Sequence, residues 1–407
     1  MRIIETANAH HIDAPIDRLS RIVSWHPDGK SIFVLRWQKL PPETPLSEVW
    51  KKGQVYRHFL GTDSEKDKAV FGHGLYPDVE IEPELGPTVR AFPDSEYIFI
   101  HGYRGESHPL QIYAERLAEI GQKNTKWRKI VDYQDEVSAF TVYKNQIFLL
   151  TSKNSPRYKI IQTSAARPDL TKPKVVVTSG ERIISEMAIA RDALYVSVLD
   201  GGIDRLIRVD LRGGRTQPVK LPFEGAIAAL TTDPYSAGAL YRSSSWVKPV
   251  GQYLHDPKRQ GVIDTNLIPK PQVDLSHIEV SRAMARSHDG ALVPLTILYK
   301  RGLRLDGKDP TLLEGYGAYG VPMQPYLSLP RLAWLERGGV YAVAHVRGGG
   351  EIRTRMAPRR AEVEQAKLLE GFYRLRRISN QRALHFCESS RRGRSKRGRT
   401  SRRRRDH

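Results

Sequence analysis

Short apolar or aromatic runs separated by turn clusters recur along residues 15 to 260 of the chain. Each run has the length of a β-strand, and two runs joined by a turn make a strand–turn–strand unit. Five such units occur, at residues 21–36, 89–103, 137–152, 186–200 and 227–244. After a longer first interval their central turns lie about 40 to 50 residues apart, which is the period of a four-stranded propeller blade. The pattern predicts a β-propeller of about five blades.

Turn-forming residues stand between the paired runs. They occur as Pro27-Asp28-Gly29, Pro93-Asp94-Ser95 and Asp233-Pro234. Proline presets the backbone for the second position of a turn, and aspartate accepts a hydrogen bond from the backbone two residues on. A string of unrelated hairpins is the alternative interpretation, and the regular spacing favours the propeller.

The pattern changes after residue 275. Residues 329–337 have the spacing of a helix. One glycine-rich turn precedes this helix at 315–317, and another follows it at 348–350. Strands that alternate with a helix predict a parallel α/β sheet, which places its chemistry at the carboxyl ends of its strands. The denser apolar runs that predict these strands are residues 292–299, 311–313 and 340–346.

Composition restricts the class of protein. A length of 407 residues supports two or three domains. The single cysteine, Cys387, excludes a disulfide framework and a zinc site built on cysteines. No run reaches the roughly 18 apolar residues of a membrane span, and the first residues lack the apolar core of a signal peptide. We therefore expect a cytoplasmic protein without a membrane segment, and neither a cofactor nor a metal site is predicted.

The net charge of +20 is concentrated at the end of the chain. Residues 351–407 hold 19 Lys and Arg against 6 Asp and Glu, a balance of +13, and the other 350 residues contribute +7. Residues 389–405 contain ten Lys or Arg and almost nothing apolar to bury. We expect this basic tail to be disordered.

Five short motifs follow one another in a fixed order. They are Val55-Tyr56-Arg57-His58-Phe59-Leu60-Gly61-Thr62, Ser287-His288-Asp289-Gly290 with Val293-Pro294-Leu295, Pro310 to Gly317, Arg331 to Trp334, and Arg347-Gly348-Gly349-Gly350-Glu351. Together they resemble the prolyl oligopeptidase family of serine peptidases, which joins a propeller to an α/β-hydrolase domain. The resemblance covers about residues 15 to 351 and implies the hydrolysis of short peptides after proline or a related residue.

The resemblance implies three parts. Residues 1–272 would form an incomplete β-propeller of about five blades, where the family has seven. Residues 273–351 would form the first strands of a truncated α/β-hydrolase domain, and residues 352–407 the disordered basic tail. Met1 would then be an internal start or a break in a damaged gene.

Tyr316 is the one catalytic residue that the resemblance implies. In the family, the tyrosine of the glycine-tyrosine-glycine turn donates its hydroxyl to the oxyanion. A tyrosine in a glycine turn after a buried strand can aim a donor at a developing negative charge, or it can simply pack its ring in the turn. Glu314 stands where the family usually has an aromatic residue.

The serine triad is missing from the sequence. Hydrolysis on this fold needs a nucleophile in a G-x-S-x-G elbow, followed along the chain by an acid and a histidine. No G-x-S-x-G occurs, Ser395 has the wrong glycine spacing, and neither His385 nor His407 has a carboxylate placed to orient it. We therefore predict that this chain is catalytically inactive.

A shifted reading frame would explain the change of composition after Glu351. Met356 has a single codon, and alanine codons begin with G, so reading one base later forces tryptophan five residues past Glu351, where the family has one. With permitted codons, the stretch 352–360 then reads tyrosine-glycine before that tryptophan, and the stretch 393–401 yields a G-x-S-x-G. We expect the chain to come from a frameshifted gene whose nucleophile elbow is encoded but not translated.

Two other functions remain open from the sequence. The propeller could act as a binding platform, since propellers often bind partners at their channel mouths. The Arg-rich tail could bind nucleic acid without sequence preference, through charge alone. Neighbouring histidines His10 and His11 could suggest a metal, but without carboxylate or thiol ligands beside them they are better interpreted as part of a flexible polar end.

Overall fold

The structure of the protein is a computed structural model that describes residues 1–19, 24–103, 109–123, 125–259, 261–287, 290, 292–317, 321–346 and 385–386. Contacts between residues divide the chain into two compact units. The first unit holds Met1–Leu275, Gly315–Ser328 and the described residues 345–346. The second holds Ser276–Glu314, Leu329–Ala344 and the described residues 385–386.

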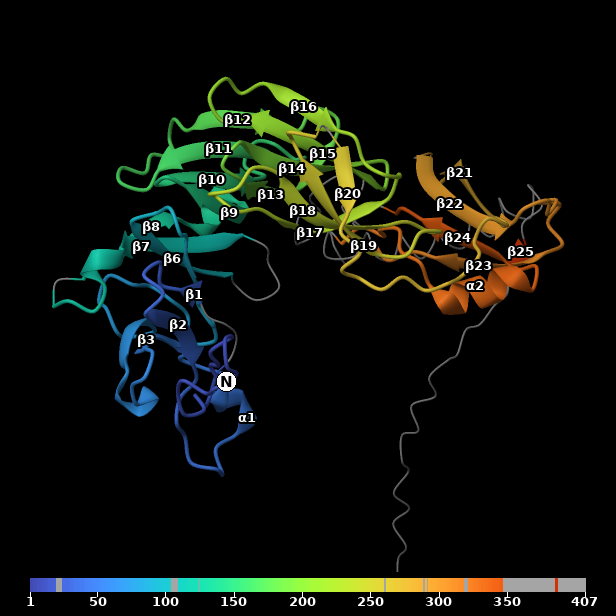
Figure 1. The fold of residues 1–407 in the computed structure, drawn as a ribbon. Helices are drawn as coiled ribbons and strands as arrows, with labels where there is room; N and C mark the ends of the chain where they lie inside the picture. The colour runs from blue at the N-terminus through green and yellow to red at the C-terminus, as the bar shows by residue number, and fades with distance from the viewer. Residues whose placement is uncertain are drawn as a thin grey trace, which may run out of the picture. The chain divides into compact units, whose positions relative to one another are not determined.

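Five four-stranded antiparallel sheets form the first unit, and the strands of each follow their order along the chain (Figure 1). Blade 1 contains β1 (Ser24–Trp25), β2 (Ser31–Arg36), β3 (Gln54–Phe59) and β4 (Lys68–Gly72). Blade 2 contains β5 (Thr88–Ala91), β6 (Tyr97–Tyr103), β7 (Leu110–Arg116) and β8 (Arg128–Val131). Blade 3 contains β9 (Val137–Tyr143), β10 (Gln146–Thr151), β11 (Lys159–Ser164) and β12 (Lys174–Thr178). Blade 4 contains β13 (Ile183–Ile189), β14 (Ala193–Asp200), β15 (Ile203–Asp210) and β16 (Thr216–Val219). Blade 5 contains β17 (Ala226–Thr231), β18 (Ala239–Ser244), β19 (Gly251–Asp256) and β20 (Gly261–Asp264).

Four short helical segments lie in the connections: α1 (Leu46–Val49), η1 (Ser64–Lys66), η2 (Leu117–Glu119) and η3 (Tyr133–Asp135). The prediction of a propeller built from about five four-stranded blades is confirmed. Each predicted strand–turn–strand unit corresponds to the first two strands of one blade.

The turns predicted from proline and aspartate connect these strand pairs. Between β1 and β2 the backbone N–H of Lys30 donates to the Asp28 carboxylate at 2.8 Å, and Gly29 takes a left-handed φ of +68°. Between β17 and β18 the N–H of Tyr235 donates to the Asp233 carboxylate at 2.9 Å. These local hydrogen bonds end one strand and start the next without help from the rest of the fold.

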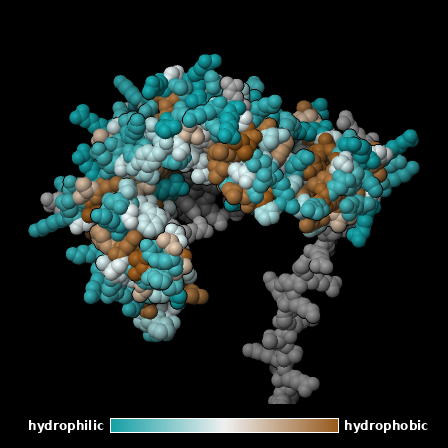
Figure 2. Space-filling view, in the orientation of Figure 1, coloured by the Kyte–Doolittle hydropathy of each residue, from teal (hydrophilic) through white to brown (hydrophobic). Residues whose placement is uncertain are grey.

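Apolar side chains pack between neighbouring blades. Alternation along β6 shows how: Ile98 and Ile100 join the cluster shared with blade 1, whereas Phe99 joins the cluster shared with blade 3. Successive side chains of a strand point to opposite faces, so a central strand fills two interfaces at once. Most of the surface seen in Figure 2 is hydrophilic, with smaller hydrophobic patches.

The second unit is a five-stranded sheet in the order β21-β22-β24-β23-β25. Its elements are β21 (Ile278–Arg286), β22 (Leu292–Lys300), β23 (Pro310–Glu314), α2 (Leu329–Glu336), β24 (Val340–Ala344) and β25 (His385–Phe386). Strand β23 runs parallel to β24 and β25, but β22 runs antiparallel to both β21 and β24. The expectation of a parallel sheet therefore holds for β23, β24 and β25 but is wrong for β22, because the long hairpin β21–β22 reverses the chain.

The predicted disordered tail, residues 352–407, lies outside the described residues apart from strand β25. Among the described residues, no helix has the length and apolar character needed to cross a membrane.

Phe71 provides a test of the interface between blades 1 and 2. The ring is fully buried and packs edge-on against Trp127 at a centroid distance of 4.9 Å. We expect Phe71→Ala to lower the free energy of unfolding by about 3–5 kcal/mol, because it leaves a cavity between two sheets. Urea unfolding followed by tryptophan fluorescence measures the loss.

The matched control is Phe59→Ala in the same blade. That ring is 47% exposed and stacks under the Arg57 guanidinium at 4.6 Å. Its loss should cost less than about 1 kcal/mol. Equal losses at the two positions would contradict the assignment of Phe71 to an inter-blade core.

Candidate active site at the carboxyl ends of strands β23 and β24

Tyr316 lies two residues beyond the end of β23. Its side chain is 50% exposed, and within the described residues no hydrogen bond engages its hydroxyl. Gly317 follows with a left-handed φ of +66°, a conformation that glycine adopts without steric cost. The turn therefore presents a phenol donor at the carboxyl end of a parallel strand, where α/β sheets carry their chemistry.

A polar cluster closes the end of β23 just before this turn. The Tyr341 hydroxyl donates to Glu314, and the Arg331 guanidinium lies 3.9 Å from the same carboxylate. The guanidinium carbon also sits 4.4 Å from the centroid of the Tyr341 ring, a cation–π contact. Burial, followed by the hydrogen bond to Glu314, raises the pKa of Tyr341 to about 12, so this phenol remains a donor at neutral pH. Glu314, which departs from the family's aromatic residue, thereby ties helix α2 to strands β23 and β24.

The segment that carries Tyr316 is anchored on blades 4 and 5. Gln324 donates from its amide nitrogen to the Asp204 carboxylate at 2.9 Å. One residue on, the carbonyl of Pro325 accepts a hydrogen bond from the Ser244 hydroxyl at 3.0 Å. All of these residues belong to the first unit. The backbone of the candidate catalytic segment is thus held by side chains of the propeller.

Asp204 is a fully buried carboxylate in β15. Burial raises its pKa to about 6, although the N–H of Ile227 donates to it at 2.7 Å and opposes the shift. The charge of Glu186 in β13 raises the pKa of Asp204 further. Burial also raises the pKa of Glu186, whose carboxylate accepts from the N–H of Leu230 at 3.2 Å. The carboxylate that accepts from Gln324 therefore has a raised pKa, and a second buried carboxylate contributes to that shift.

The residue after β24 also contacts blade 4. His345 is buried, and a Cβ placed on Gly202 would come within 2.9 Å of its ring. Gly202 lies in the tight connection between β14 and β15 and has a φ of +84°. Only glycine fits both the backbone angle and the close approach of the histidine. The segments that follow β23 and β24 thus both contact blade 4, at Asp204 and at Gly202.

Sequence reasoning missed Asp204, Gln324 and His345. A single aspartate in a strand gives no pattern that separates it from an exposed strand aspartate. The pair Gly201-Gly202 was the one available signal, because adjacent glycines at a hairpin tip often mark a close backbone approach.

The remaining motif residues lie outside the described part of the chain. These are His288, Asp289, Arg347 with the glycine run 348–350, Ser395, His407 and the basic stretch 389–405. Of His385 the structure describes the strand but not the side chain. Within the described ranges, no group of three or more His, Cys, Asp or Glu side chains is arranged to hold a metal ion.

The fold and the strand-end turn define the class of protein: a propeller of four-stranded blades followed by a mixed sheet with an exposed tyrosine at a strand end. The family model described as "Prolyl oligopeptidase, N-terminal beta-propeller domain" matches residues 1–262. The chain belongs to the prolyl oligopeptidase family, and the resemblance predicted from its motifs is confirmed.

Similar proteins include a prolyl endopeptidase of Elizabethkingia meningoseptica, 24% identical over 81% of this chain and 45% of the relative. A dipeptidyl aminopeptidase of Pseudoxanthomonas mexicana is 25% identical over 81% of this chain and 43% of the relative. A solved structure from a study of two prolyl endopeptidases matches 93% of this chain and 55% of its own, with a TM-score of 0.79 and 22% identity, a likeness of fold. The chain spans less than half the length of these curated relatives.

The raised pKa of Asp204 predicts a pH dependence. Because the folded-state pKa, about 6, lies above the reference value of 3.8, the folded protein binds this proton more tightly than the unfolded chain does. The free energy of unfolding should therefore fall as pH rises from about 4 to about 6, by at most ~3 kcal/mol, and level off above that range. Asp204→Asn removes the titration, so the difference between wild type and variant in urea unfolding should change across this range.

Asp200→Asn is the control for this experiment. That carboxylate lies on the neighbouring strand β14 and is 44% exposed. A difference between wild type and Asp204→Asn that stays constant from about pH 4 to 7 would contradict the assignment.

Proposed function

We propose that this chain derives from a serine peptidase of the prolyl oligopeptidase type, which hydrolyses short peptides after proline or a related residue, and that the chain itself is inactive because it lacks the nucleophile, the acid and the base. In this proposal the blades restrict access to the reacting bond, and Tyr316 donates a hydrogen bond to the oxyanion. Membership of the prolyl oligopeptidase family supports the substrate class. So do the names of the relatives, a prolyl endopeptidase and a dipeptidyl aminopeptidase.

The observation that carries the proposal is the placement of Tyr316. Its phenol is half exposed directly after a parallel strand, and the segment that follows is fixed on the propeller by the Gln324–Asp204 hydrogen bond. A preorganised donor stabilises negative charge that develops in the transition state, and it does so best when its backbone cannot shift. Anchoring by Asp204 serves that requirement.

We propose three functional parts with the boundaries expected from the sequence: a propeller domain at 1–272, the first part of the peptidase domain at 273–351, and a basic tail at 352–407. The 407 residues contain no G-x-S-x-G. Without a nucleophile, only residual rate enhancement from the oxyanion donor and binding is expected.

The purified 407-residue chain should therefore show background rates on a fluorogenic proline peptide. A serine-directed phosphonate should label no residue, as judged by intact mass. Turnover that this reagent abolishes would overturn the proposed inactivity.

We further propose that the gene is frameshifted after the codon for Glu351. Its nucleotide sequence should read an aromatic-glycine pair one base out of frame, ahead of the tryptophan that the codon of Met356 forces. Restoring the frame by a one-base change should give a chain with the nucleophile elbow and with proline-specific turnover. An in-frame message without those codons would contradict the proposal.

Tyr316→Phe in the frame-restored protein tests the oxyanion role. We expect kcat to fall about 10²- to 10³-fold with little change in KM, because the lost hydrogen bond forms in the transition state. Tyr326→Phe, a hydroxyl deletion in the same segment, is the control and should retain activity. An active Tyr316→Phe protein would exclude Tyr316 as the oxyanion donor while leaving the peptidase assignment intact.

A further inference from the structure

Blade 1 has one face that no other described blade covers. Alternation along β2 and β3 turns Phe33 and Val55 toward blade 2. It turns Ile32, Val34 and Arg36 of β2, together with Tyr56 and His58 of β3, to the opposite side, here called the outer face of blade 1. Between the other blades, the corresponding apolar faces are buried against a neighbouring sheet.

Residues 1–19 cover this outer face. Ile16 is 1% exposed and packs with Ile32 and Val34. The backbone of this segment is fixed to itself and to the blade: the amino group of Met1 donates to the carbonyl of Ile16 at 2.7 Å, and Leu19 forms an antiparallel bridge with Arg36. The segment therefore takes the place that a further sheet would occupy.

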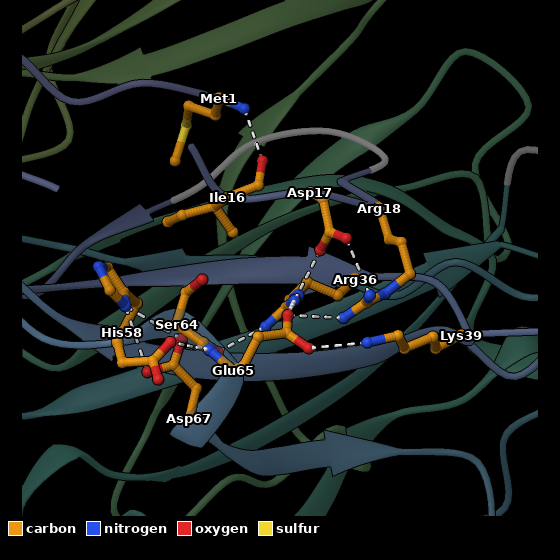
Figure 3. A network of polar contacts seen from close by, with 11 residues as sticks. Met1, Ile16, Asp17, Arg18, Arg36, Lys39, His58, Ser64, Glu65 and Asp67 are labelled. Carbon is orange, nitrogen blue, oxygen red and sulfur yellow. Dashed lines mark hydrogen bonds and ion pairs between the residues drawn. The ribbon is translucent and has the colours of Figure 1, made fainter. Parts of the chain in front are cut away.

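The outer face also contains two basic side chains buried out of water. Arg36 is 4% exposed, and its guanidinium donates to Asp17 at 2.7 Å, to Glu65 and to the carbonyl of Ser64 at 2.6 Å (Figure 3). The hydrogen bond from Arg36, and then that from Arg18, lowers the pKa of Glu65 to about 2. Asp17 comes from the covering segment and Glu65 from blade 1.

His58 is the second basic group and is fully buried. Its Nδ1 lies 3.0 Å from the Asp67 carboxylate, and its Nε2 lies 3.4 Å from the Asp13 carboxylate. The imidazole therefore lies between two carboxylates, with its hydrogen bond on the Nδ1 side. The other oxygen of Asp13 accepts from the N–H of Gly61 at 2.5 Å. Again one carboxylate comes from blade 1 and one from the covering segment.

The two arrangements follow one rule. Each basic side chain keeps one carboxylate from its own blade, Glu65 or Asp67, and receives a second from residues 13–18. Removing Asp17 takes away one of the two carboxylates that pair with the buried Arg36 guanidinium, which is destabilising. Asp13, Ile16 and Asp17 therefore match the outer face in charge, shape and spacing.

We propose that residues 1–19 are an intramolecular cap that closes the outer face of blade 1 through Asp13 and Asp17 and excludes a second copy of the chain from that face. The cap is specific to this face because its two carboxylates match the two buried basic groups. A capped terminal sheet needs no partner to bury its apolar side, as in repeat proteins whose end repeats carry a different outer surface.

Hydrogen exchange with mass spectrometry on the full-length chain tests this. In Asp13→Asn/Asp17→Asn we expect amides of residues 31–36 and 54–59 to exchange at least about tenfold faster, since the buried Arg36 guanidinium loses an ion pair and the N–H of Gly61 loses a charged acceptor. Protection of β14 and β15 in blade 4 should be unchanged and shows that the variant is folded. The control, Asp78→Asn, alters an exposed carboxylate of the connection after β4 and should change neither region.

In the double variant, the uncovered outer face of blade 1 should also bind a second copy of the chain. Sedimentation velocity should show concentration-dependent dimers of Asp13→Asn/Asp17→Asn and a monomeric wild type. A synthetic peptide of residues 8–19 added in excess should restore protection of 31–36 and suppress the dimers, whereas the same peptide with both aspartates replaced by asparagine should not.

Unchanged protection of blade 1 in the double variant would overturn the proposal. So would faster exchange spread equally over all five blades, because it would mean general destabilisation rather than an opened face. A wild-type protein that already dimerises through residues 31–36 and 54–59 would also overturn it, since the face would then accept a second copy despite the cap.

Discussion

The first unit depends on one constraint: a blade whose central strands are apolar on both sides must be covered on both sides. Every residue of β2 is buried, as are the first seven of the eight residues of β14. Such strands cannot face water on either side, so stacking of sheets supplies most of the stabilising burial. The interfaces between successive blades follow directly, each built from side chains of two neighbouring sheets.

The same constraint explains where the fold buries charge. A face that must be covered but also carries Arg36 and His58 needs a cover that brings anions, and Asp13 and Asp17 supply them. Asp204 shows the opposite arrangement, because its charge is opposed by burial and by Glu186 rather than balanced by a cation. The buried Arg36 is therefore paired with carboxylates, whereas burial and Glu186 both disfavour the charge of Asp204.

The propeller contributes to the candidate site as a scaffold. Blade 4 presents Asp204 from a strand and Gly202 from a hairpin tip, and each receives a segment that follows a parallel strand. Tyr316 itself makes no such contact among the described residues and stays half exposed. In the proposed function, anchoring at Gln324 and Pro325 would help to fix the segment that carries this donor.

Local rules predicted a large part of this fold. Three signals are properties of neighbouring residues: period-two alternation, turn chemistry at Asp28 and Asp233, and the repeat spacing. The five blades could therefore be predicted without knowing which sheets pack against each other. The turn around Tyr316 was identified in the same way, because glycine, tyrosine and glycine are adjacent in the chain. The mixed direction of the second sheet was not, since an apolar run gives the existence of a strand but not its direction.

Contacts between residues far apart in the chain could not be predicted from the sequence. Asp13 meets His58 across 45 residues of chain, and Gln324 meets Asp204 across 120. An aspartate has the same local pattern whether it is exposed or buried, so the raised pKa of Asp204 and the contact of Asp13 with His58 exist only after folding. The sequence alone determined the blades, their turns and the family, because these depend on residues close together in the chain. The tertiary structure decided which carboxylates are buried, which groups they bind and which face of blade 1 is covered by residues 1–19, because burial depends on residues far apart in the chain.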